Sequence, residues 1–139
     1  MTANEFVWKF GWEEASEIVA GVPRKYMECY YSTLHWCNRN KKYSDRFKPR
    51  INLVNIADLK RLVESYDLVN ELGGFEKAKL HLVATDKHLG YTHVYLHENG
   101  RYCWLDDYID HIPFCAISID SATKAIADVE SVKSLKEMT

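Results

Sequence analysis

The sequence predicts an α+β fold, in which a small antiparallel sheet containing a type I′ hairpin packs against several helices. Three features predict it. Apolar residues recur at helical spacing in several segments, Asn99-Gly100 divides an alternating run into two strands, and a further strand precedes a last helical stripe. With 139 residues, the chain is expected to form a single domain, 1–139, with a helical part at about 3–84 and a hairpin, strand and helix at about 91–137.

Two short helices are expected at the start, in residues 4–10 and 12–20. Each segment places its apolar side chains on one helical face, and Gly11 separates the two. Gly21 and Pro23 end the second helix, because glycine suits the position past a helix end and proline cannot continue the helix.

Strand signals follow these helices. Residues 26–36 are ambiguous, although their partial alternation and the pair Tyr30-Tyr31 favour a strand. Residues 50–54 include Ile, Leu and Val and predict a second short strand.

The clearest helix prediction covers residues 56–72. Asn55 can cap this helix, and Asp58 completes a pattern close to a capping box. An apolar stripe at helical spacing, which we interpret as core, contains Leu59, Leu62, Val63, Tyr66, Val69 and Leu72. Gly73-Gly74 ends the helix, and residues 75–83 predict another.

Two helix corners share one sequence pattern. Gly11-Trp12-Glu13-Glu14-Ala15 and Gly74-Phe75-Glu76-Lys77-Ala78 both place a glycine and an aromatic residue before Glu, a charged residue and Ala. The glycine would supply a left-handed turn and the aromatic would pack the corner. The pattern is either one helix–turn–helix unit used twice or a chance recurrence. Neither corner suits the reading of DNA, because the helices that follow open with acidic or mixed charges.

Residues 92–105 form the predicted hairpin. A two-residue turn at Asn99-Gly100 would pair Leu96 with Cys103 and Tyr95 with Trp104. One face would be core, and the other would carry the candidate partner-binding residues His93, Tyr95, His97, Tyr102 and Trp104. Tyr and Trp are enriched at protein interfaces, which favours a docking surface. The alternatives are base stacking and burial beneath the N-terminal helices.

The chain is expected to end in a strand and a helix. Residues 114–119 form the strand, and Asp120 or Ser121 caps a helix that runs to about Glu137. The predicted buried stripe of this helix contains Ala122, Ala125, Ile126, Val129, Val132 and Leu135.

The charge is nearly balanced, with 18 basic and 20 acidic residues and a formal net charge of -2. This disfavours broad nucleic-acid binding, which needs a concentrated positive field. A local exception is the basic segment 39–50, with Arg39, Lys41, Lys42, Arg46, Lys48 and Arg50 interleaved with aromatic residues. It predicts a site for either single-stranded nucleic acid or an acidic protein surface, or else a solvated loop.

No catalytic motif or cofactor-binding loop is recognisable. His93 and His97 would lie roughly 13 Å apart on a strand, too far to share a metal ion. Asp106, Asp107, Asp110 and His111 form the densest acidic cluster, which predicts either a small metal-dependent hydrolase site or a polar connection with capping aspartates. We expect no catalytic residue, no metal and no cofactor.

A cytoplasmic location is expected. The N-terminus lacks the features of a signal peptide, and no stretch approaches the roughly 20 apolar residues of a membrane helix. The four cysteines are dispersed and contain no Cys-x-x-Cys pair, which disfavours structural zinc. Cys103 and Cys115 lie in apolar runs and are expected to act as small hydrophobic residues.

The run from Asp58 to Val69, continuing through Gly73-Gly74-Phe75-Glu76-Lys77-Ala78, resembles a segment of small uncharacterised accessory proteins of enterobacterial lambdoid phages and prophages. The opening Glu5-Phe6-Val7, with Gly11-Trp12-Glu13 and Ala15, looks similar to the start of such proteins. The resemblance covers about a third of the chain and brings no catalytic residues. It implies a non-enzymatic protein that binds and modulates a host protein, such as a defence enzyme or a nuclease.

Overall fold

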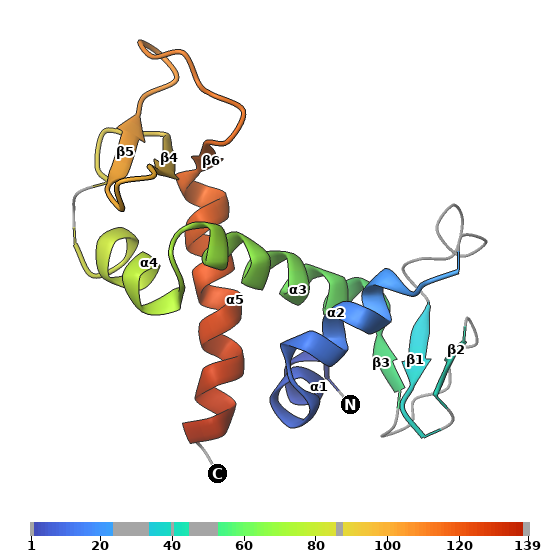
Figure 1. Cartoon of the computed structure of the whole chain (residues 1–139). Coiled ribbons are helices and arrows are strands. Elements are labelled where there is room, and N and C mark those ends of the chain that lie inside the picture. The colour runs from blue at the N-terminus through green and yellow to red at the C-terminus, as the bar shows by residue number, and fades with distance from the viewer. Residues whose placement is uncertain (1, 24–33, 40, 45–52, 86–87, 138–139) are drawn as a thin grey trace. The chain divides into compact units, whose positions relative to one another are not determined.

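A computed structural model describes residues 2–23, 34–39, 41–44, 53–85 and 88–137 (Figure 1). It has the predicted α+β fold, built from helices and two small antiparallel sheets. The chain divides into two compact units, one made of residues 1–64 and 130–139 and the other of residues 65–129.

The first unit contains α1 (Ala3–Phe10), α2 (Trp12–Ala20) and a three-stranded sheet. The strands are β1 (His35–Cys37), β2 (Lys42–Ser44) and β3 (Leu53–Asn55), in the order β2-β1-β3 with antiparallel pairing. The start of α3 (Ile56–Glu71) and the end of α5 (Ile119–Glu137) belong to this unit. Its core is built around fully buried side chains that include Phe6, Leu34, Leu59 and Leu62.

The second unit contains the end of α3, α4 (Phe75–Leu82), a second three-stranded sheet and the start of α5. The strands are β4 (His93–Leu96), β5 (Tyr102–Leu105) and β6 (Ile117–Ser118), in the order β5-β4-β6, again antiparallel. Val69, Leu72, Leu82, Val94 and Ile126 are among its buried residues.

The helices follow their predicted bounds closely. The Asn55 side chain accepts a hydrogen bond from the Asp58 N–H at 3.0 Å, which confirms the predicted cap of α3. The apolar stripes of α3 and α5 are buried as expected, except that Tyr66 and Leu135 are only half-buried.

The predicted cap of the last helix is wrong by a few residues. Ser118, rather than Asp120 or Ser121, caps α5, because its Oγ accepts from the Ser121 N–H at 3.1 Å. No helix in the described part of the chain is both long and apolar enough to cross a membrane.

The short strands differ more from prediction. Most of residues 26–36 and 50–54 lie outside the described residues, and the strands observed nearby are β1 and β3. The strand expected at 114–119 is reduced to the two residues of β6, because residues 114–116 make a turn instead.

The hairpin exists, but its predicted register is wrong by one residue. Leu96 pairs with Tyr102, and Tyr95 pairs with Cys103. Both backbone bonds of the turn involve His97, whose N–H donates to Arg101 O while its carbonyl accepts from Gly100 N–H. The loop therefore has three residues and ends at Gly100 with a φ of +83°, the other common hairpin connection.

The one-residue shift divides the predicted aromatic face, since cross-strand partners share a face. Tyr102 and Trp104 lie on the side of Val94 and Leu96, whereas His93 and Tyr95 lie on the side of Cys103 and Leu105.

The order helix, helix and three strands occurs twice in the described residues, over 3–55 and 56–118, and α5 follows the second copy. The central strand is the first of each three, and the two sheets have equivalent strand orders. The first N–H of the following helix donates to the residue before that central strand in both copies, from Ile56 to Leu34 O and from Ile119 to Thr92 O, each at 2.9 Å.

The shared corner pattern has the same backbone in both copies. Gly11 has φ 91° and ψ 164°, and Gly74 has φ 100° and ψ 165°. Ala15 and Ala78, four residues after these glycines, are both fully buried. We therefore interpret the recurrence as one structural unit used twice.

Candidate functional site

The face of the hairpin that carries Tyr102 packs against other residues of the second unit. The Tyr102 hydroxyl donates a hydrogen bond to Leu72 O, just past the end of α3. Its ring lies 5.0 Å from the His81 ring and 5.9 Å from the Trp104 ring, and the Lys77 ammonium lies 5.5 Å from its centroid. Burial raises the pKa of the Tyr102 hydroxyl. Tyr102 thus joins β5 to α3 and α4.

Tyr95 lies on the other side of the hairpin, beside two thiols. A side-chain hydrogen bond with Cys103, its cross-strand partner, raises the pKa of the Tyr95 hydroxyl, and the charge that Cys103 and Cys115 would carry on ionisation adds to the effect. Cys115 is exposed, which corrects its expected role as a small hydrophobic core residue, and Cys103 is half-buried.

The connection between β5 and β6 is an ordered loop that extends away from the sheet (Figure 1). Asp106 and Asp110 organise its first turn. The Asp110 carboxylate accepts from the Asp106 N–H at 2.9 Å, and the Asp106 carboxylate accepts from the Tyr108 N–H at 3.0 Å. The Asp107 N–H donates to the Thr92 hydroxyl at 2.9 Å, which ties this turn to the residue before β4.

A second turn follows in the same loop. The Ala116 N–H donates to Pro113 O at 3.0 Å, so Phe114 and Cys115 occupy the two central positions of the turn. The loop is therefore held by its own hydrogen bonds at both ends.

These turns place large apolar side chains in solvent. Tyr108 is 91% exposed, Ile109 is 76% exposed, and Phe114 is fully exposed. A polar loop with isolated exposed apolar residues needs no special explanation, but here three large ones lie within seven residues of one loop. We call Tyr108, Ile109 and Phe114 the apolar loop patch.

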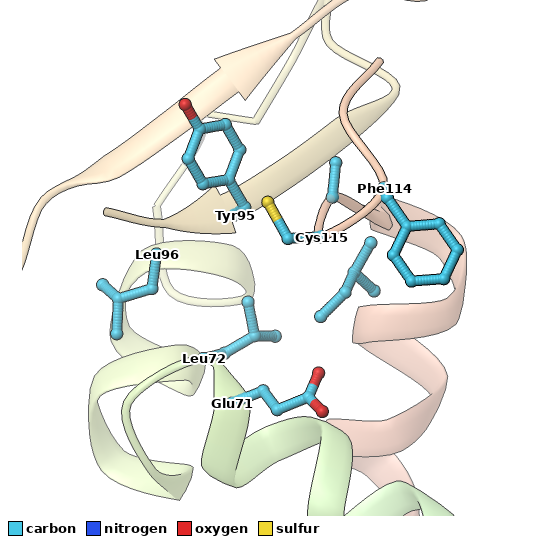
Figure 2. Close-up of a pocket in the computed structure, with 8 residues that line it drawn as sticks. Glu71, Leu72, Tyr95, Leu96, Phe114 and Cys115 are labelled. Carbon is cyan, nitrogen blue, oxygen red and sulfur yellow. The ribbon is translucent and has the colours of Figure 1, made fainter. Parts of the chain in front are cut away.

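A cavity of about 430 Å³ opens beside Phe114. Figure 2 draws its eight lining residues, which are the six labelled ones and Ala116 and Ile117. Figure 2 shows the Cys115 thiol turned toward Tyr95, with Leu72 between them and the Glu71 carboxylate. The volume lies within the range of small-ligand pockets.

The acidic residues of the loop mainly stabilise its backbone. Asp106 and Asp110 accept backbone hydrogen bonds, as capping aspartates do. In the part of the chain that the structure describes, no group of three or more potential ligands, including Asp107, His111, His93 and His97, is arranged to hold a metal ion.

The basic segment is described only in part. Lys42 lies in β2, and Lys41 donates to Asn38 Oδ1 at 2.7 Å while its ammonium lies 5.8 Å from the Phe10 ring. Arg46, Lys48 and Arg50 lie outside the described residues.

No family model, curated protein or solved structure matches this chain. Its function therefore has to be inferred from the geometry of its own surface.

Sequence reasoning missed the apolar loop patch. It placed Phe114 in a strand and interpreted the acidic loop as either a metal-dependent hydrolase site or a polar connection. The signal available in the sequence was the apolar pair Tyr108-Ile109 between Asp107 and Asp110, since capping aspartates alone do not require apolar neighbours.

Proposed function

We propose that this chain is a non-enzymatic binding protein that docks a partner protein through the apolar loop patch. In keeping with the phage resemblance of its sequence, the partner is a protein of the bacterial host whose activity the chain modulates. The exposure of Tyr108, Ile109 and Phe114 on an ordered loop carries this proposal.

The order of the loop supports docking rather than incidental exposure. Binding costs less when the contacting side chains are already held in place, because less conformational freedom is lost. The hydrogen bonds made by Asp106, Asp107 and Asp110 provide that order for Tyr108 and Ile109.

The charge of the second unit defines the chemistry of the partner. Residues 65–129 contain 10 acidic and 5 basic residues, a formal net charge of -5, whereas the rest of the chain contains 10 acidic and 13 basic residues. The loop itself adds Asp107 beside the patch. Complementary potentials steer association and select partners. The expected partner is a protein with an apolar groove that is bordered by Lys and Arg.

The loop can be tested by affinity capture from an enterobacterial lysate after nuclease treatment, at moderate salt. Replacing both Tyr108→Ser and Ile109→Ser should abolish capture of one basic host protein, because the apolar contacts supply most of the binding energy. The matched control is Leu89→Ser, which removes a side chain that is 66% exposed outside the loop.

Equal capture by the loop variant and the wild-type chain would contradict the proposal. Capture that disappears after nuclease treatment would instead favour the basic segment and nucleic acid.

A further inference from the structure

The lining of the cavity beside Phe114 combines polar and apolar atoms and carries one full negative charge. Leu96, Ala116 and Ile117 provide aliphatic surface, and Tyr95 provides an aromatic ring. The hydroxyl of Tyr95 and the thiol of Cys115 are neutral polar groups, so the Glu71 carboxylate is the only charged group in the lining. A ligand of this cavity is therefore expected to combine an aliphatic part with a positive charge.

Glu71 has no hydrogen bond or ion pair with any residue in the described ranges. It is also the last residue of α3, whose last turn contains no basic residue. The C-terminus of a helix carries partial negative charge and favours a cation nearby. The Glu71 carboxylate adds to this negative potential. One cation placed here would interact favourably with both the carboxylate and the end of the helix.

We propose that this cavity receives the side chain of a lysine on the bound partner, with its ammonium group at Glu71. The four methylene groups of lysine can pack on the aliphatic surface of the cavity while its ammonium group meets the exposed Glu71 carboxylate. Phe114 belongs to both the apolar loop patch and the cavity lining, so a protein docked on the loop reaches the cavity opening. This inference rests on the proposed function and names one contact of the partner.

The test uses the full chain without any partner. N-acetyl-lysine methylamide and N-acetyl-norleucine methylamide have similar apolar lengths, but only the lysine derivative carries an ammonium group. Each is titrated to about 20 mM, a range that detects weak contacts, while backbone amide chemical shifts are followed by NMR. The lysine derivative should give saturable shifts at Leu72, Tyr95 and Ile117 and bind about threefold or more tightly than the norleucine derivative.

Variants locate the contact. Glu71→Gln should weaken binding of the lysine derivative by about threefold, the scale of a partly exposed ion pair. Glu98→Gln removes the same charge from the hairpin loop of the same unit and should leave binding unchanged. The lysine derivative should also slow carbamidomethylation of Cys115, read by mass spectrometry, and leave Cys37 unaffected.

Equal binding of the two derivatives, or an unchanged affinity in Glu71→Gln, would overturn the inference. Absence of saturable shifts in the wild-type chain would overturn it as well. None of these results depends on loop docking, which the capture experiment tests separately.

Discussion

At the scale of single residues, Gly11 and Gly74 make the two helix corners possible. Both combine φ near +95° with an extended ψ, a region that is essentially restricted to glycine. The sequence predicted a glycine-dependent corner at each position, but a left-handed turn rather than this conformation. Glycine permits both, so its presence does not distinguish them.

Gly11→Ala and Gly74→Ala should each lower the free energy of unfolding by about 1–3 kcal/mol. A Cβ at either position would meet nothing within 4 Å, so the cost comes from backbone strain and should be similar at both corners. Urea unfolding measures it. Glu13→Ala, an exposed change next to the first corner, should stay within about 0.5 kcal/mol of the wild type. Alanine variants as stable as the wild type would contradict the backbone strain, and clearly unequal losses would contradict the equivalence of the two corners.

At the scale of elements, the long helices and the presence of a hairpin were predictable, whereas the register of the hairpin was not. Asn99-Gly100 suits a two-residue turn and also a three-residue loop that ends in glycine. The alternating pattern of β4 and β5 could not distinguish the two registers, because both faces carry large apolar side chains. Contacts distant in sequence accompany the observed register: Tyr102 to Leu72 O, and Lys77 to Gly100 O at 2.6 Å.

Tyr102→Phe should lower the free energy of unfolding by about 1 kcal/mol, the usual contribution of one hydrogen bond. The change removes only the hydroxyl that donates to Leu72 O and keeps the ring contacts with His81 and Trp104. Chemical denaturation of the two proteins at neutral pH measures the difference. An unchanged stability would show that this bond does not hold β5 to the end of α3.

The same pair of proteins tests the pKa of Tyr102. Because burial raises this pKa in the folded chain, the folded state holds the proton at pH values where the unfolded chain has lost it. The stability contribution of the hydroxyl is full below the ordinary pKa of 10.0 and is lost as the pH rises through the folded value. The difference between wild type and Tyr102→Phe should therefore be constant up to about pH 9 and shrink at higher pH. A difference that grows above that pH would contradict the direction of the shift.

At the scale of the whole molecule, one helix–helix–sheet unit occurs twice, with opposite net charge in the two compact units. The corner pattern revealed part of this repeat in the sequence. The equivalent strand orders could not be predicted, because the strands have only two to four residues and leave little periodic signal. The formal net charge of -2 for the complete chain does not reveal this difference, because the opposite net charges of the two units partly cancel.

Asp107→Asn should slow association with the basic partner by about twofold to fivefold at low salt, and the effect should fade at high salt. The fold should be unaffected, because only the backbone N–H of Asp107 makes a described hydrogen bond. Stopped-flow or surface-based kinetics at several salt concentrations measure the association rate. A change confined to the dissociation rate would mean that this charge lies inside the contact rather than at its border.

The most direct test of loop docking is site-specific photo-crosslinking in bacterial cells. A photoreactive phenylalanine derivative is placed at Tyr108 in one protein and at Leu89 in another, and the crosslinked products are identified by mass spectrometry. The docking model predicts one basic host protein crosslinked from Tyr108 but not from Leu89, through a peptide that borders an apolar groove with Lys or Arg at its edge. The same products from both positions, or none from Tyr108, would contradict docking through the apolar loop patch.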